Sequence, residues 1–168
     1  MTELTHIGPD GASRMVDVGE KPVTQRVARA SAIVRMDAQT QRQITRDGTA
    51  KGNPLEVARL AGIMAAKQTG TLIPLCHPLP LESVEIAFTF PSETTVAIEA
   101  TARVTAKTGV EMEAMVAASV AALTLYDMCK SIDRTMTIEQ VRLEEKSGGR
   151  SGHFVRTEEE KKRNTNQH

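Results

Sequence analysis

Four charged residues, Glu111, Glu113, Asp127 and Lys130, flank a largely apolar stretch within the segment KTGVEMEAMVAASVAALTLYDMCKS at Lys107–Ser131. Asp127 and Lys130 are three residues apart, so on a helix they share a face and form either an ordinary ion pair or a proton-transfer pair. Their apolar neighbours predict partial burial, where a charge without a role is costly. Glu111 and Glu113 stand at the start of the segment. Glu111 is also explained as a helix cap, so Glu113 is the better binding candidate.

A proline-rich segment, TLIPLCHPLPL at Thr71–Leu81, carries the second group of candidates. Three prolines keep it extended, and its leucines indicate that it is covered. A stiff loop of this kind would hold Cys76 and His77 in fixed positions. The alternative is a packed cysteine and a hydrogen-bonded core histidine. The other histidines lie near the chain ends and no CxxC or HExxH spacing occurs, so no metal site is predicted.

Lys51 precedes the helix whose start is most clearly marked. Asn53 is a typical N-cap, Pro54 suits the first helical position, Glu56 completes a capping box, and Gly70 predicts the end. Backbone N–H groups and the helix dipole favour an anion at such a start. Lys51 is therefore a candidate anion-binding residue, with a solvated loop lysine as the alternative.

The segment that carries the four charges is predicted to be a long helix. Thr108 and Glu111 have the spacing of a capping box, and Ala114–Leu125 is apolar all round, which predicts burial against a sheet or another subunit. At about 1.5 Å per residue, Glu113 and Asp127 are about 21 Å apart along such a helix. One compact pocket cannot readily hold both from one chain. We therefore expect an oligomer with sites at subunit contacts.

The remaining elements follow from alternating and capping patterns. A polar helix should follow Asp37 and stop at Asp47–Gly48. Alternation of apolar and polar residues predicts strands at Val23–Met36, Val84–Phe90, Val96–Val104 and Thr137–Glu145. The order β-α-β-β-α-β, with one additional helix, predicts an α+β, ferredoxin-like antiparallel sheet with helices packed on one face.

Composition narrows the class of protein. The 168 residues predict a single catalytic domain at 15–155 between flexible tails at 1–14 and 156–168. Lys plus Arg and Asp plus Glu number 21 each, which argues against nucleic acid as a partner. Two cysteines, no recognisable leader and no apolar run of membrane-spanning length predict a cytoplasmic protein with reduced thiols and no membrane partner.

Two other functions are compatible with this strand order. One is a non-catalytic ligand-binding or regulatory module, because a fold does not fix a function. It gives no reason for a charged pair in the long helix. The other is an RNA-binding domain of the RRM type, which needs aromatic residues on its open sheet face. Phe88 and Phe90 lie on the strand face that we assign to the core, which disfavours it.

Several long motifs occur in the same order as in a known enzyme family. They are KGNPLEVARLAGIMAAKQT at Lys51–Thr69, PLCHPLPL at Pro74–Leu81, KTGVEMEAMVAASVAALTLYDMCK at Lys107–Lys130 and KSGGRSG at Lys146–Gly152. With them the chain resembles the MoaC family, the cyclic pyranopterin monophosphate synthases of molybdenum cofactor biosynthesis, over roughly Met15–Phe154. The resemblance implies a ferredoxin-like fold, assembled as a homohexamer, a trimer of dimers. It also implies a lyase reaction, in which a cyclised dihydro-GTP made by a radical S-adenosylmethionine GTP cyclase is rearranged to the pterin with release of pyrophosphate.

The resemblance also implies roles for individual residues. The family's catalytic aspartate corresponds to Asp127 and its lysines to Lys51 and Lys130. Its substrate pocket corresponds to Leu75, Cys76, His77, Met112 and Glu113, and Glu111 is kept as a further binding candidate. Such a substrate needs fixed cations for its triphosphate, which Arg26, Lys51, Lys146 and Arg150 can supply. Opening and closing its ring needs proton donors and acceptors, for which Asp127, Lys130 and His77 are suited. No cofactor is required by the sequence, although the triphosphate would admit Mg²⁺.

Overall fold

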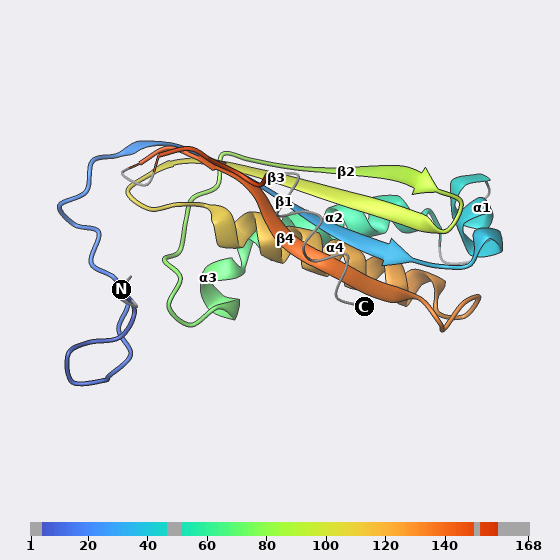
Figure 1. Ribbon diagram of the computed structural model, residues 1–168, viewed down its shortest axis with the longest axis horizontal. Coiled ribbons are helices and arrows are strands. Elements are labelled where there is room, and N and C mark those ends of the chain that lie inside the picture. Colours follow the sequence, from blue (N-terminus) through green and yellow to red (C-terminus); the bar gives the residue numbers. More distant parts are fainter. Residues whose placement is uncertain (1–4, 47–51, 150–151, 158–168) are drawn as a thin grey trace.

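A computed structural model of the protein describes residues 5–46, 52–149 and 152–157. These residues form, in chain order, β1 (Thr24–Arg35), α1 (Ala38–Arg46), α2 (Pro54–Lys67), α3 (Thr69–Leu72), β2 (Ser83–Ser92), β3 (Thr95–Ala106), α4 (Glu111–Cys129), β4 (Thr137–Ser147) and β5 (Phe154–Val155). The strands form one sheet in the order β2-β3-β1-β4-β5, and all neighbours are antiparallel. Figure 1 shows α2 and α4 along one side of this sheet. The predicted ferredoxin-like fold is confirmed.

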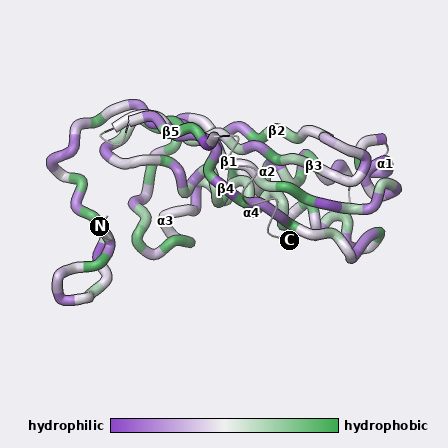
Figure 2. The backbone as a smooth tube through the Cα atoms, in the orientation of Figure 1, coloured by the Kyte–Doolittle hydropathy of each residue, from purple (hydrophilic) through white to green (hydrophobic). Residues whose placement is uncertain are grey.

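The core lies between the sheet and the two long helices. Strand residues alternate between two faces, so every second residue of β1 and β3 points toward the helices. On β1 these are Ala28, Ala30, Ala32 and Val34, and on β3 they are Val96, Ile98, Ala100, Ala102 and Val104, all at most 1% exposed. Figure 2 shows the hydrophobic residues gathered along the helices and alternating with hydrophilic ones in the strands. The small alanines allow α4 to approach the sheet closely.

Helix α4 packs on β1, β3 and β4 and also against α2. Its buried residues recur in pairs at helical spacing, which gives one face to the sheet and one to α2: Ala114, Ala117, Ala118, Ala121, Ala122, Leu125, Met128 and Cys129. It is long and apolar enough to cross a membrane, yet most of it is buried inside this fold, so it is a core helix. One stripe of the helix is not covered by the chain itself, so burial of that stripe against another subunit stays a prediction. Leu123 is 58% exposed, and the side chains of Asp127 and Lys130 are 57% and 52% exposed.

The helix starts and ends match the sequence unevenly. At α2, the Asn53 side chain accepts hydrogen bonds from the backbone N–H groups of Leu55 and Glu56, as predicted. The helix ends at Lys67, before Gly70, and the short α3 replaces the first part of the predicted extended segment. Gly70 lies inside α3, and its backbone passes close to Pro78. An added Cβ would lie 3.0 Å from the proline Cα, which explains why a glycine stands here. That contact fixes the proline-rich loop against α3.

The predicted capping box at α4 is wrong. The residue before the helix is Val110, and no side chain caps the first turn. The Glu111 side chain instead lies against Gly109, where its carboxylate would collide with any Cβ, and pairs with Lys146. The Glu111 carboxylate therefore binds Lys146 and does not complete a capping box with Thr108.

The two edges of the sheet differ. At one edge β2 is covered in part by Arg59 of α2, whose guanidinium donates to the Ile86 carbonyl and lies 5.2 Å from the centre of the Phe88 ring. At the other edge the two-residue strand β5, which the sequence did not predict, pairs with Glu145 and Lys146.

The N-terminal residues before β1 run apart from the sheet (Figure 1). Residues 5–14 make a small turn closed by the Ile7–Ser13 bridge and by hydrogen bonds between His6 and Arg14. Residues 1–4 and 158–168 of the predicted tails, and the predicted helix end at Asp47–Gly48, lie outside the described residues. The division into one domain and two flexible tails stays a prediction.

Candidate functional site

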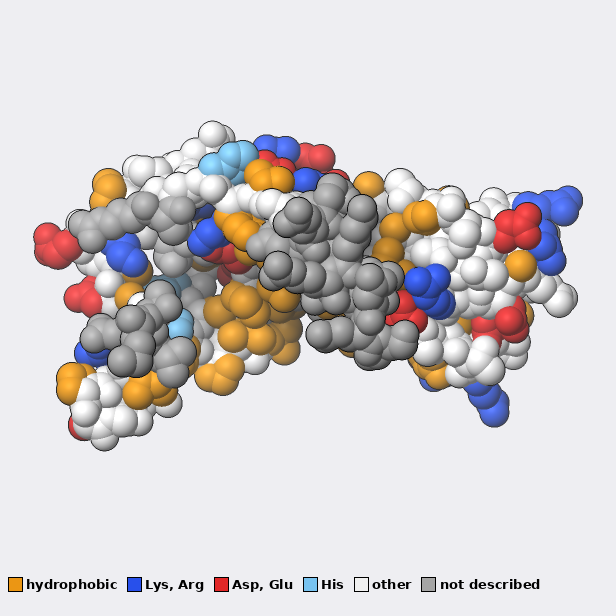
Figure 3. Space-filling model, in the orientation of Figure 1, with side chains coloured by type: hydrophobic (Ala, Val, Ile, Leu, Met, Phe, Trp, Pro, Cys, Tyr) orange, Lys and Arg blue, Asp and Glu red, His pale blue; other side chains and the backbone are white. Residues whose placement is uncertain are grey.

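A pocket of about 840 Å³ lies at the N-terminal end of α4. Its walls come from the start of α4, the ends of β1 and β4, the proline-rich loop and the N-terminal segment. Figure 3 shows the hollow between the N-terminal segment and the rest of the molecule, with charged side chains and histidine at its edge. Every predicted substrate-binding residue lines this pocket: Arg26, Leu75, Cys76, His77, Glu111, Met112, Glu113 and Lys146.

Arg26 is the most unusual of these residues because its cationic side chain is almost completely buried. The residue is 8% exposed and lies on the core face of β1. One guanidinium nitrogen donates to the Lys107 carbonyl at 3.5 Å, and the buried Nε has no partner among the described residues. A buried N–H group without a partner is costly, so its presence indicates a site for an acceptor that this chain does not supply. An anionic ligand in the pocket would provide one.

Gly148 and Gly149 make room for this arginine. Both have positive φ angles, 96° and 74°, which glycine adopts without the steric cost that other residues meet. A Cβ at Gly149 would collide with the Arg26 guanidinium, and one at Gly148 with the Gln25 carbonyl. The glycine pair of KSGGRSG therefore serves to let the backbone after β4 pass directly over the arginine.

Two carboxylates share the pocket and differ in their surroundings. Glu111 forms an ion pair with Lys146, with an Oε1–Nζ distance of 2.9 Å. Glu113 is 3% exposed, and this burial, helped by the nearby charge of Glu111, raises its pKa to about 7. Glu113 is therefore close to half protonated at neutral pH, and it can accept or donate a hydrogen bond to a ligand.

The Cys76–His77 loop forms the opposite wall. Leu75, Cys76 and His77 are half-buried, and the Cys76 backbone N–H closes a turn on the Ile73 carbonyl at 3.1 Å. Desolvation and the neighbouring Glu113 raise the pKa of the Cys76 thiol, which keeps it protonated. Cys76 is thus a neutral wall of the pocket, whereas His77 remains the candidate for proton transfer.

The predicted catalytic pair lies elsewhere. Lys130 and Asp127 form an ion pair with an Nζ–Oδ1 distance of 2.7 Å, and the carboxylate raises the pKa of Lys130. They stand at the C-terminal end of α4, and the pocket is at its N-terminal end, so within one chain they do not meet the pocket residues. The sequence correctly placed the two groups far apart. The pair is more than half exposed within the single chain, so its predicted burial stays a prediction that depends on another subunit. Lys51 lies outside the described residues.

Sequence reasoning missed three cationic or ionisable residues that line the pocket, namely His6, Lys21 and Lys107. His6 and Lys21 lie in the N-terminal segment, whose first part was treated as a tail. Lys107 opens the long apolar segment and was treated only as its boundary. Its position directly before TGVEME, the segment that carries Glu111 and Glu113, was the one feature of the sequence that could have indicated a place in the pocket.

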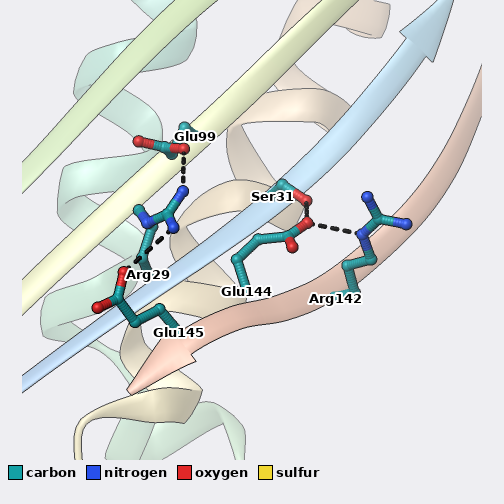
Figure 4. Close-up of polar contacts among 6 residues, drawn as sticks. All are labelled: Arg29, Ser31, Glu99, Arg142, Glu144 and Glu145. Atoms are coloured by element: carbon teal, nitrogen blue, oxygen red, sulfur yellow. Dashed lines mark hydrogen bonds and ion pairs between the residues drawn. The ribbon is translucent and has the colours of Figure 1, made fainter. Parts of the chain in front are cut away.

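The sheet face away from the helices carries ion pairs instead of aromatic rings. Figure 4 shows Arg29 between Glu99 and Glu145, at 2.7 and 3.1 Å, and Glu144 beside Ser31 and Arg142. Phe88 packs toward the core, as predicted, whereas Phe90, assigned to the same face, is 41% exposed near the end of β2. This polar face offers no stacking platform of the RRM type, which removes the argument for RNA binding.

No group of three or more histidine, cysteine, aspartate or glutamate side chains arranged for a metal occurs within residues 5–46, 52–149 and 152–157. Glu111 is already paired with Lys146, and Glu113 carries a raised pKa, so the pocket carboxylates are poor ligands for a divalent cation.

Comparison with known proteins gives consistent matches. Residues 15–149 match the model of the MoaC family. A cyclic pyranopterin monophosphate synthase of Magnetococcus marinus is 61% identical over 158 residues, covering 93% of this chain and 96% of the relative. The cyclic pyranopterin monophosphate synthase 1 of Mycobacterium tuberculosis is 57% identical over 154 residues, covering 92% and 91%. A synthase of the same name from Desulfitobacterium hafniense is 54% identical over 154 residues, covering 92% and 94%.

Proposed function

Because this chain belongs to the MoaC family, we propose that the pocket at the start of α4 is where it binds a cyclised dihydro-GTP. The chain is an enzyme of molybdenum cofactor biosynthesis that carries out the cyclic pyranopterin monophosphate synthase step. In this lyase reaction the nucleotide is rearranged to the pterin and pyrophosphate leaves. The observation that carries the location is Arg26, a buried cation with an unpaired N–H at the pocket wall.

The pocket suits the two ends of this substrate. Arg26, Lys107 and Lys146 gather where β1, β4 and the start of α4 meet, and they suit the triphosphate. Glu113 stands deeper, at the first turn of α4, where it suits the N–H edge of a guanine-type ring. His77 on the opposite wall is placed to exchange a proton with the ring.

Asp127 and Lys130 can reach the pocket only if they come from another copy of the chain. Asp127, Lys130 and Leu123 form a stripe at the far end of α4 in which each residue is more than half exposed. We propose that the chain forms a homohexamer, a trimer of dimers, in which this stripe and Lys51 of one copy face the pocket of another. The positive charge of Lys130 would then stabilise the ionised form of Asp127, which would accept a proton in the ring rearrangement. We also propose that the enzyme is cytoplasmic and receives its substrate from a radical S-adenosylmethionine cyclase.

The direct test is to incubate the pure protein with the cyclised dihydro-GTP and to follow pyrophosphate and pterin together. We expect equimolar release by the wild type. Arg26→Ala should raise KM at least about tenfold, because a charge-assisted contact to phosphate is lost. Arg42→Ala, which removes an exposed arginine of α1, is the matched control and should behave like the wild type. Binding without product would instead support a regulatory module.

Mixing two impaired variants tests the shared site, with activity measured at a substrate concentration well below the KM of Arg26→Ala. Asp127→Asn and Arg26→Ala damage opposite ends of α4. If each site combines groups from two copies, mixed assemblies contain some sites with neither substitution, and activity should rise on mixing. Mixed assemblies that are no more active than the separate variants, with subunit exchange verified by mass spectrometry, would contradict a site shared between copies.

The metal proposal is separate. We propose that Mg²⁺, where present, is carried by the triphosphate and not by protein ligands, since the pocket carboxylates are occupied or hard to ionise. Treatment with EDTA should then leave turnover within about twofold of the untreated enzyme. Complete loss of activity that Mg²⁺ restores would show that the metal is required.

A further inference from the structure

The N-terminal segment before β1 forms one wall of the pocket, although the sequence alone assigned it no role. Thr5, His6, Val16, Val18, Lys21 and Pro22 all line the cavity. They face it from the side opposite the start of α4. Without this segment, the cavity would be open along that side.

Between Met15 and Val18 the segment has an inner and an outer face. Val16 and Val18 are half-buried and line the pocket, whereas Met15 is 51% exposed and Asp17 is exposed. The alternation has the period of an extended strand, so the segment presents an apolar face to the cavity even though no strand pairs with it.

The segment is held to the rest of the protein by few contacts. Lys107 donates a hydrogen bond from its Nζ to the Gly19 carbonyl at 2.7 Å. Among the described residues, the other hydrogen bonds of residues 5–21 join residues of this segment to one another. A segment with so few contacts to the rest of the protein becomes more ordered when a ligand in the pocket contacts it.

Charge indicates what that ligand would be. Among the described residues that line the pocket, Lys21, Arg26, Lys107 and Lys146 are cationic, and Glu111 and Glu113 are acidic. Glu111 is paired with Lys146, and Glu113 is close to half protonated at neutral pH. The charges of Lys21, Arg26 and Lys107 therefore exceed those of the carboxylates, which suits a polyanion.

We propose that residues 15–22 are a strap that closes over the phosphate groups of the bound nucleotide, with Lys21 contacting them directly. The strap is anchored at Gly19 by Lys107, its two valines cover the apolar part of the cavity, and Lys21 adds a cation to those of β1 and β4. This inference rests on the proposed function, because it takes the substrate to be a nucleotide triphosphate bound in this pocket.

The kinetic test compares two full-length variants that remove one positive charge each from the same segment. Lys21→Ala should raise KM for the cyclised dihydro-GTP about tenfold and leave kcat within about twofold. Arg14→Ala is the control, because Arg14 is exposed and does not line the pocket; its KM should stay within about twofold. An unchanged KM in Lys21→Ala, or an equal rise in both variants, would overturn the direct contact.

A second measurement does not need turnover. Amide hydrogen exchange of the wild-type protein is followed with and without saturating pyrophosphate, the predicted leaving product. Exchange in residues 15–22 should slow severalfold, whereas exchange on the exposed face of β2 should not change. Saturation of the pocket without protection of the strap refutes the proposal. Absence of turnover in the wild type would contradict the proposed function instead, and the exchange result would still report on the strap.

Discussion

Replacing Glu113 by glutamine should change how stability depends on pH. Burial of this carboxyl raises its pKa from 4.5 to about 7 in the folded protein. The unfolded chain ionises it near the lower value, so folding takes up a proton between these two pH values. The stability contribution of the protonated group is therefore full below about pH 4.5 and is lost as the pH rises through about 7.

The size of the effect follows from the shift. About 2.5 pKa units at about 1.4 kcal/mol each correspond to roughly 3.5 kcal/mol at most. Most of this loss falls between about pH 5 and about pH 8. Because the pocket is open to water, we expect about 2 kcal/mol of it to be observed. Glu113→Gln removes the titrating group and keeps its shape, so its stability should fall by about 2 kcal/mol less over the same pH range.

The assay is urea unfolding at several pH values and at one protein concentration, since an oligomer is stabilised by mass action. Glu85→Gln, the same change at an exposed position of β2, is the matched control and should follow the wild type. If the stability difference between Glu113→Gln and the wild type is independent of pH, the carboxyl does not titrate as we infer, and its assignment as a group close to half protonated is wrong.

Three further substitutions test single contacts. Asn53→Ala removes the two hydrogen bonds that cap α2 and should lower the free energy of unfolding by about 1 kcal/mol, measured by urea unfolding. Leu125→Ala removes part of a fully buried side chain of α4, leaves a cavity and should cost about 2–5 kcal/mol in the same assay; a cost near zero would mean that α4 repacks. Gly149→Ala places a methyl group against Arg26 at a φ of 74°, so KM should rise about tenfold, and an unchanged KM would show that the arginine can move aside.

The fold was predictable because strand alternation and helix caps are local. Buried and more exposed residues alternate along β1 from Arg26 onward and along β3 from Val96 to Thr105, and Asn53–Pro54 marks a helix start that the structure reproduces. The capping box of α4 failed because Glu111 has a stronger partner, Lys146, that is 35 residues away in the sequence. Sequence spacing does not register such competition.

The site was predictable where motif residues lie on regular elements. The pocket residues named from the resemblance line one cavity, and the separation of Glu113 from Asp127 followed from helix geometry alone. Two features were out of reach. Asp127 is exposed in the single chain, and the cover that we propose for it would come from another copy. The place of Lys21 depends on how an irregular segment returns to the pocket.

Arg59 has a consequence for self-association. The open side of β2 is the longer exposed strand edge of the sheet, and such edges invite a strand from another molecule to add by backbone pairing. Here the Ile86 carbonyl already accepts a hydrogen bond from the Arg59 guanidinium, which also lies against the Phe88 ring. An incoming strand would have to displace both contacts. The arrangement therefore disfavours edge-to-edge pairing of sheets from different molecules.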